Sequence, residues 1–363
     1  MKLLLLTLEC WSLTASLFTA VGLLRLARRR TPMSAATPLS PLRVLLLRPV
    51  DAPTEQELDN LAAPVDLPPG AELRHVVLSP YRPRLGAGVE WLYSDPVTAN
   101  RKVGHLLHAF EVLELEGMQV LAIDADVRVD AALVQGLVTS LEAGAGASTA
   151  APSPEGGHGL AARALRGLLR HTHHSFHALE AMSAGAKTMS GKAVGLSAAA
   201  RAELLGLGEH IGEDLELAKR LHARGHRVGF CTAPARVPQR PASAVLERIT
   251  RWMQVLRAHR PGLYPSIPLL FAPTWPLLLG AALLSHPTLS ALVLLLLLLR
   301  TALALALASP GEKGAAMSGW LLGEALLLTA FGVSLGRRTV TWRGRRFSLA
   351  RGGRMLTPPG EAP

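Results

Sequence analysis

Long apolar runs at both ends of the chain enclose a middle region in which apolar and polar positions alternate. The first run, residues 3–24, contains Glu9 as its only charge and is long enough for a membrane-spanning helix. Four arginines follow it within residues 25–30, whereas a cleaved signal peptide carries its positive charge before the apolar run. The pattern therefore favours an uncleaved anchor, residues 1–30, with its carboxyl side in the cytosol. A signal peptide is the alternative.

Three further apolar segments lie within residues 263–336. The first, residues 269–284, is interrupted by Pro273 and Pro276. The other two each carry a charged residue: 287–308 contains Arg300, and 317–335 contains Glu324. All three are candidates for membrane segments.

The tail, residues 337–363, has seven arginines between positions 337 and 354 and no acid in that stretch, so we expect it to be cytosolic. If the middle region is also cytosolic, the number of C-terminal spans must be even. We therefore expect the proline-interrupted segment to be interfacial or re-entrant. This leaves two C-terminal spans, with three as the alternative.

The middle region, residues 42–262, follows a linker at 31–41 that is rich in Pro, Ser, Thr and Ala. Short apolar runs alternate there with helical stretches, which predicts an α/β fold with a mostly parallel sheet flanked by helices. The Ala- and Gly-rich stretch 141–157 is expected to be a surface loop. One N-terminal and two to three C-terminal transmembrane helices complete the predicted architecture.

Composition supports a membrane setting. Hydrophobic residues make up 49% of the chain and aromatic residues only 4%, and the net charge is +11. The basic residues cluster beside the apolar segments without interleaved aromatics, so we expect anionic lipid headgroups and not nucleic acid as their partners. The two cysteines, Cys10 and Cys231, imply no disulfide framework.

Two acids, Asp124 and Asp126, end the apolar run 120–123. In a strand this spacing puts both carboxylates on one face, where they repel each other unless a cation lies beside them. Open α/β sheets bind ligands at the carboxyl ends of their strands. We therefore predict a metal site there, with a polar turn as the alternative.

Two further motifs carry possible chemistry. Asp214 lies near the start of a predicted helix, where the helix dipole favours its ionised form, so it could accept a proton from a hydroxyl or could serve only as a cap. Arg248, Arg251 and Trp252 share one helix face. Such a face suits a diphosphate beside an apolar acceptor, or a membrane surface.

Together these motifs resemble those of membrane-bound family 2-type glycosyltransferases, and most closely those of the ceramide glucosyltransferases. The resemblance covers roughly residues 42–262 and implies a GT-A fold. It also implies that a sugar is transferred with inversion from a UDP-sugar to the hydroxyl of a membrane lipid. Glucose is the leading candidate for the sugar, and ceramide is the leading candidate for the lipid. The matching stretches are "NRKVGHLL", "IDADVRV", "MSGKAVGLS", "GEDLELAKRLHARGHR" and the Arg-x-x-Arg-Trp of residues 248–252.

The resemblance also implies roles for individual residues. Asp124 and Asp126 would hold Mg²⁺ or Mn²⁺ on the diphosphate, and Asp214 would be the catalytic base. Asn100 and Lys102 would lie near the nucleotide sugar. The diphosphate and the acceptor entrance would be covered by Arg248, Arg251 and Trp252. The protein would be integral to a bacterial inner membrane, with a cytosolic catalytic domain.

One departure from the family leaves the donor open. The family has a further Asp after its second strand, but residues 78–86 contain no acid, and Asp51 follows the first strand instead. A hopanoid or diacylglycerol acceptor remains an alternative to ceramide. A second alternative is that the protein is a non-catalytic, lipid-binding relative of these enzymes.

A histidine cluster lies in the stretch "RHTHHSFHALE". His173 and His177, at i and i+4, could bind zinc on a helix, but no Cys or carboxylate is spaced to complete the site. A pH-sensitive or acceptor-lining role is the favoured interpretation for this cluster, which also contains His171 and His174.

Overall fold

The computed structural model describes residues 1–29, 42–65, 67, 70–156, 159–182, 188–308, 310–342 and 344–357. The predicted linker 31–41 lies outside them. The chain divides into two compact units of three segments each, which we call the helical unit and the sheet unit. The helical unit comprises Met1–Ser34, Gly156–Gly185 and Gln239–Leu349, and the sheet unit comprises Ala35–Glu155, Ala186–Pro238 and Ala350–Pro363.

The sheet unit is built on a seven-stranded sheet of order β3-β2-β1-β4-β6-β5-β7. Every neighbouring pair is parallel except those made by β6, which runs antiparallel to β4 and β5. The mostly parallel sheet predicted from the sequence is therefore confirmed. The strands are β1(Arg43–Pro49), β2(Glu72–Ser79), β3(Val89–Tyr93), β4(Gln119–Ile123), β5(Ala147–Glu155), β6(Ala193–Leu196) and β7(Val228–Pro238).

Both faces of this sheet are covered by helices, which explains why its central strands are near-continuous apolar runs. Leu45 and Leu47 of β1 face one core with side chains of α3, α6 and α7, and Val44 and Leu46 face another with side chains of α4. The helices of this unit are α2(Glu55–Ala62), α3(Arg101–Val112), α4(Ala131–Glu142), α6(Ala198–Glu203) and α7(Glu213–Ala223).

The expectation of a surface loop at residues 141–157 is wrong for its second half. Residues 147–155 form β5, which pairs with β6 and β7, and its first four residues are fully buried. The strand consists of small side chains because its neighbours approach closely. A Cβ added to Gly195 of β6, for example, would collide with the Ser148 hydroxyl.

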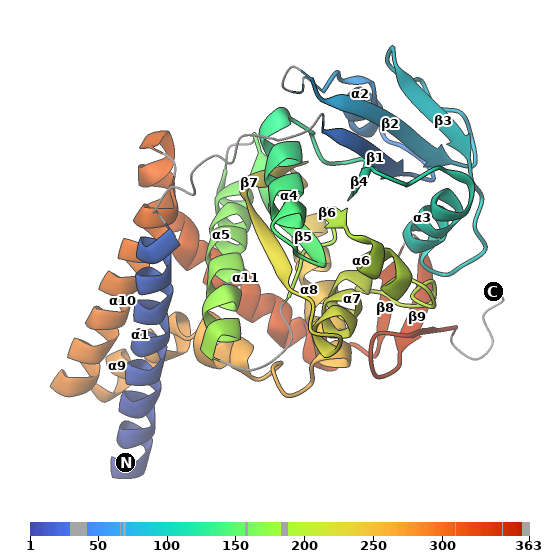
Figure 1. Cartoon of the computed structure of the whole chain (residues 1–363). Helices are drawn as coiled ribbons and strands as arrows, with labels where there is room; N and C mark the ends of the chain where they lie inside the picture. The colour runs from blue at the N-terminus through green and yellow to red at the C-terminus, as the bar shows by residue number, and fades with distance from the viewer. Residues whose placement is uncertain are drawn as a thin grey trace. The chain divides into compact units, whose positions relative to one another are not determined.

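Among its described residues, the helical unit contains three helices that are long and apolar enough to cross a membrane: Lys2–Ala27 of α1, and α10 and α11. Helices α1, α9 and α10 pack alongside one another (Figure 1). The helices are α1(Lys2–Arg29), α5(Leu160–Met182), α8(Ala242–His259), α9(Thr274–Leu284), α10(Pro287–Leu307) and α11(Lys313–Gly336), with a hairpin of β8(Thr339–Trp342) and β9(Arg345–Leu349).

The proline-interrupted segment forms one irregular turn, Ile267–Phe271, and then the 11-residue helix α9. A helix of this length falls well short of the roughly 20 residues that span a bilayer. Among the described residues, two C-terminal helices therefore reach spanning length.

The charged residues of the two C-terminal spans are paired with each other. The guanidinium of Arg300 on α10 bonds the Glu324 carboxylate on α11, and each residue is 3% exposed. Arg300 also donates to the Phe271 carbonyl at 3.1 Å, and Glu324 accepts from the Thr274 backbone N–H at 3.1 Å. Pairing of this kind makes two isolated charges tolerable in apolar helices.

Helices α5 and α11 approach each other through glycines. A Cβ on Gly167 of α5 would collide with the Gly319 carbonyl of α11, and one on Gly323 would lie 2.5 Å from the Leu168 nitrogen. Small residues at this spacing allow helix backbones to pack in direct contact. An amphipathic helix from the middle of the chain is thus packed tightly against a membrane-type helix.

Candidate active site

The predicted carboxylate pair lies at the carboxyl end of β4. Asp124 follows the last residue of the strand, and its backbone N–H donates to the Lys192 carbonyl at 2.9 Å. The Asp126 side chain is almost fully buried, whereas about a quarter of the Asp124 side chain is exposed. The pair therefore lies at the carboxyl ends of the parallel strands, where the sequence predicted it.

Two lysines neutralise these carboxylates. The Lys192 Nζ lies 2.8 Å from both carboxylate oxygens of Asp126 and 2.9 Å from Asp124 Oδ2. The Lys102 Nζ lies 2.8 Å from Asp124 Oδ1 and 3.2 Å from Glu213 Oε1, and also bonds the Gly191 carbonyl. Although burial acts to raise the pKa of Asp124, Lys102 and Lys192 hold that pKa well below its usual range.

Asn100 directly precedes the helix that carries Lys102 and is its N-cap residue. Its side-chain oxygen caps α3 by accepting from the Val103 backbone N–H at 3.3 Å. Its amide group donates to the His210 carbonyl at 2.8 Å and to Glu213 Oε2 at 3.1 Å. Asn100 is fully buried, and it joins the start of α3 to the start of α7.

Asp214 lies in the first turn of α7, after Gly212, whose φ of 72° is in the left-handed region. Its Oδ2 accepts from the Gly191 backbone N–H at 2.7 Å, and its Oδ1 accepts from the Leu215 backbone N–H at 2.9 Å. The two backbone donors act to lower the pKa of Asp214, in the direction expected at the start of a helix. Burial and the neighbouring charge of Glu213 outweigh Lys102 and the backbone donors, and raise the pKa of Asp214 to about 7.

The buried Arg48 supports the loop that carries the carboxylates. It lies in β1 and is fully buried. Its Nη2 donates to the backbone carbonyls of Asp124, Ala125 and Val127 at 3.1, 3.1 and 2.8 Å. Burial lowers its pKa to about 10, which leaves the guanidinium charged at neutral pH.

The two carboxylates at the end of β4 could hold a divalent ion only if a phosphate group supplied further ligands. Two carboxylates, Asp124 and Asp126, share one cationic partner, the Lys192 ammonium. In the part of the chain that the structure describes, no group of three or more His, Cys, Asp or Glu side chains could hold a metal ion. Mg²⁺ and similar ions are commonly held by one or two carboxylates plus substrate phosphates, and Asp124 and Asp126 match that arrangement.

Asp51, the acid after the first strand, is engaged with α3. It accepts from Arg101 Nε at 2.6 Å, and its Oδ1 lies 3.0 Å from His105 Nε2. Burial and Arg101 lower the pKa of His105 to about 4, so the ring is neutral near pH 7. Residues 78–86 contribute no carboxylate here, as the sequence indicated.

The other predicted residues lie in the helical unit. Arg248, Arg251 and Trp252 are on α8, and the Arg248 guanidinium lies 4.9 Å from the centre of the Trp252 ring. In the histidine cluster on α5, the side chains of His173 and His177 lie outside the described residues, so the zinc hypothesis is not tested by them. The His174 ring contacts the Gly22 carbonyl at 2.6 Å.

Sequence reasoning missed Lys192, Glu213 and Arg48 as parts of this site. Lys192 lies within the quoted "MSGKAVGLS" stretch, directly before the buried strand β6. Arg48 interrupts the apolar run of β1, and a charge within a buried strand is a signal that it has a specific partner.

The paired carboxylates at the end of β4 lie where open α/β sheets bind ligands. The chain belongs to glycosyl transferase family 21, whose sequence pattern matches residues 91–355. It is also similar to the solved structure of the mannosyltransferase PcManGT from Pyrobaculum calidifontis in complex with GDP-Man and Mn²⁺, with 19% identity and a TM-score of 0.48, covering 91% of this chain and 99% of that one. No curated protein sequence matches it.

Proposed function

We propose that this glycosyltransferase moves glucose from UDP-glucose, with inversion, to the hydroxyl of a ceramide-like membrane lipid at the cytosolic face. The observation that carries the proposal is the position of Lys102. Its ammonium lies 2.8 Å from Asp124 and 3.2 Å from Glu213, the residue before Asp214. It therefore connects the carboxylate pair to the first turn of α7 within one unit.

Asp214 is the proposed general base. A pKa near 7 matches the requirement that a base be partly ionised at the working pH and still take up a proton readily. The Gly191 and Leu215 backbone N–H groups fix both of its oxygens, so its orientation is set before an acceptor arrives. Its role is to take the proton from the acceptor hydroxyl.

Asp124 and Asp126 would hold Mg²⁺ or Mn²⁺, which would neutralise charge on the diphosphate. The chain itself supplies further positive charge, because Lys102 and Lys192 lie beside the same carboxylates. A leaving diphosphate develops negative charge, and fixed cations at its position favour its departure. Asn100 contributes by holding Lys102 through the α3 cap.

The lipid acceptor is supported by the three apolar helices and by the resemblance to ceramide glucosyltransferases. We propose that Arg248, Arg251 and Trp252 cover the diphosphate and the acceptor entrance, and that the basic tail contacts anionic headgroups. The protein would lie in a bacterial inner membrane with its sheet unit in the cytosol. Diacylglycerol and hopanoids are the acceptors to try if ceramide fails.

The test uses the full-length protein in lipid nanodiscs with UDP-glucose, ceramide and Mn²⁺, and follows glycolipid by mass spectrometry. We expect product that disappears with EDTA and falls at least about 100-fold in Asp214→Asn. Asp59→Asn is the matched control, because Asp59 is an exposed acid on α2 paired with Arg84 at 3.4 Å. Product from another donor or lipid would correct the substrates, and no transfer with any pairing would contradict the proposal.

A further inference from the structure

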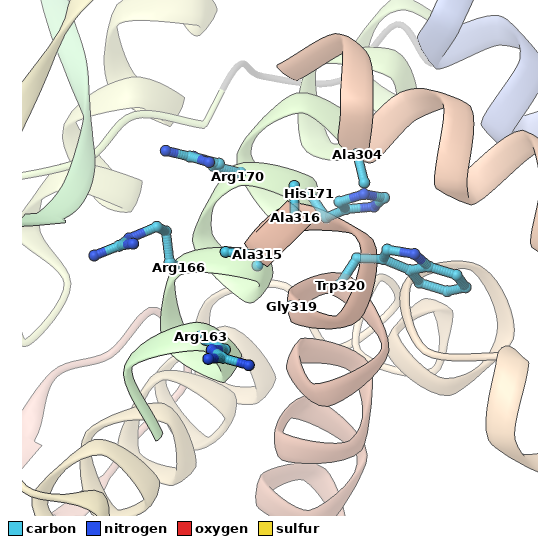
Figure 2. A pocket seen from close by; sticks show the side chains of 10 residues that line it. Arg163, Arg166, Arg170, His171, Ala304, Ala315, Ala316, Gly319 and Trp320 are labelled. Carbon is cyan, nitrogen blue, oxygen red and sulfur yellow. The ribbon is translucent and has the colours of Figure 1, made fainter. Parts of the chain in front are cut away.

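The helical unit has a cavity between α5 and α11, lined in part by His171 and Trp320 (Figure 2). The rings of these two residues stack with their centroids 6.0 Å apart. The space inside is enough for about one water molecule. A sugar, a nucleotide or a lipid headgroup therefore does not fit there.

A different feature lies near the C-terminus of the sheet unit, in residues 350–356, which we call the C-terminal segment. Its Gly352 and Gly353 have φ angles of 81° and 78°, in the left-handed region that favours glycine. The Gly353 N–H donates to the Ala350 carbonyl at 3.0 Å, and the Ala350 N–H donates to the Arg354 carbonyl at 2.9 Å. The two glycines thus permit a tight turn, and an extended stretch follows it.

The C-terminal segment pairs with residues 208–211, which we call the α7 loop because they lie directly before Gly212 and α7. The Met355 N–H donates to the Glu209 carbonyl at 2.8 Å. The Ile211 N–H donates to the Gly353 carbonyl at 3.0 Å, and the residues between these two bonds form an antiparallel bridge. Met355 and Ile211 are each 5% exposed, so the pairing satisfies backbone groups that are largely shielded from water.

The residues before α3 hold the α7 loop through its other carbonyls. The Asn100 N–H donates to the Gly208 carbonyl at 2.6 Å, and the Asn100 side-chain amide donates to the His210 carbonyl at 2.8 Å. A Cβ added to Gly208 would lie 2.8 Å from Thr98 Cγ2, so the two chain segments are in close contact. The α7 loop is therefore clamped between residues 98–100 and the C-terminal segment.

The clamped loop leads directly into the candidate active site. Asp214 is the third residue after Ile211, and it lies in the first turn of α7. Its carboxylate accepts from the Gly191 backbone N–H at 2.7 Å and from the Leu215 backbone N–H at 2.9 Å. These contacts depend on where α7 begins, and a base that is displaced by about 1 Å can lose much of its effect on the rate.

We propose that the C-terminal segment is a positioning element for Asp214. By holding the α7 loop, it fixes the start of α7 and the depth at which the Asp214 carboxylate is buried. Met355 and Gly353 are its positioning residues, and both act through the backbone of the loop. The catalytic consequence rests on the proposed function, in which Asp214 is the general base.

The first readout is hydrogen exchange, which does not depend on transfer. Full-length protein in lipid nanodiscs is compared with Met355→Pro, which lacks the N–H that bonds the Glu209 carbonyl. Mass spectrometry follows the amides of Gly191 and Leu215, because both donate to Asp214. We expect them to exchange about 5-fold faster in the variant, as the loss of one hydrogen bond predicts. Peptides from α4 report whether the sheet unit stays folded.

Thr357→Pro is the matched control, because Thr357 is exposed and already precedes a proline. Gly353→Ala is a second variant, since a Cβ is strained at a φ of 78°. Gly88→Ala introduces similar strain elsewhere in the sheet unit, at a φ of 76° with nothing within 4 Å of the added Cβ. Wild-type exchange of the two amides in both Met355→Pro and Gly353→Ala would overturn the proposal.

The second readout is the pH profile of glucosyl transfer. Burial is the largest cause of the raised pKa of Asp214, with Glu213 acting in the same direction and Lys102 against it. A loosened loop that admits water therefore lowers this pKa. We expect kcat to fall about 10-fold in Met355→Pro and the acidic limb to move to lower pH, with neither change in Thr357→Pro.

The limb separates positioning from folding, because a smaller folded fraction lowers the rate without moving the limb. Faster exchange of the two amides with an unmoved limb would overturn the positioning role. If the wild-type protein transfers no sugar, the proposed function fails. The exchange of the two amides then decides by itself whether the C-terminal segment positions Asp214.

Discussion

The ammonium of Lys192 lies 2.8 Å from each carboxylate oxygen of Asp126, an arrangement in which one lysine takes both oxygens of a nearly buried acid. The same ammonium reaches Asp124 Oδ2 at 2.9 Å. In the absence of a divalent ion, Lys192 therefore supplies the positive charge between two acids that would otherwise repel each other. This makes Lys192 a competitor for the proposed metal position.

We predict that Lys192→Met destabilises the protein by about 3 kcal/mol in EDTA, because it removes the ammonium that lies against both oxygens of a nearly buried carboxylate. Mn²⁺ should then raise the melting temperature of the variant more than that of the wild type. Differential scanning fluorimetry with and without Mn²⁺ checks both effects. Lys219→Met is the control, since Lys219 pairs with Glu216 on α7 at 3.1 Å. An equal response of wild type and variant to Mn²⁺ would contradict the competition.

The raised pKa of Asp214 predicts how the rate of transfer depends on pH. A general base must be ionised to act, so with a pKa of about 7 the activity should rise with pH through that value and then level off. The charge of Glu213 contributes to this raised pKa. Glu213→Gln should therefore move the acidic limb of the kcat/KM profile to lower pH.

Glu216→Gln is the comparison for that shift, because Glu216 lies one helical turn away and is paired with Lys219. Initial rates from pH 5 to 9 measure the profile. An acidic limb unchanged in Glu213→Gln would show that another group sets it.

We predict that Arg48 stabilises the fold through the loop that it supports, without contacting the substrate. Arg48→Met removes three hydrogen bonds to the carbonyls of residues 124–127 and should cost about 3 kcal/mol of unfolding free energy. The surface variant Arg43→Met should change stability by less than about 1 kcal/mol, because Arg43 pairs with Glu72 in solvent. Urea unfolding followed by fluorescence compares the two. Similar midpoints for both variants would argue against a supporting role.

Gly167 predicts a packing effect in the helical unit. A Cβ at this position collides with the Gly319 carbonyl, so Gly167→Ala must move α5 away from α11, with an expected cost of about 1–3 kcal/mol. Gly332→Ala is a matched control on α11, because a Cβ there meets nothing within 4 Å. Thermal unfolding in detergent should show a lower midpoint for Gly167→Ala alone.

The sequence predicted structure correctly where a local pattern of residues has one strong physical explanation. An apolar run ending in Asp124 and Asp126 located the carboxylates at the end of a strand, and the two prolines within residues 269–284 set that segment apart from the two helices of spanning length. Strand β5 was missed because its Ala, Ser and Pro side chains resemble a loop. Only the closeness of its neighbours, shown by Gly195 against Ser148, explains why small residues belong in a strand there.

Pairings between distant residues could not be read from local patterns. Lys192 and Asp126 meet because β6 runs antiparallel to β4, and nothing in the spacing of the chain predicts that orientation. Arg300 and Glu324 were each visible as a single charge in an apolar run, and only the packing of α10 on α11 makes them partners. The pKa of Asp214 also depends on its surroundings, since burial and Glu213 reverse the effect expected from the helix dipole.

The chain passes repeatedly between its two units, and each unit is assembled from three separate stretches. No truncation at either terminus can therefore release the sheet unit as a soluble fragment free of membrane-associated sequence. Residues 160–182 would remain as α5, with the glycine face that packs on α11 exposed. Chimeras between relatives with different acceptors would for the same reason need to exchange α5 together with the terminal helices.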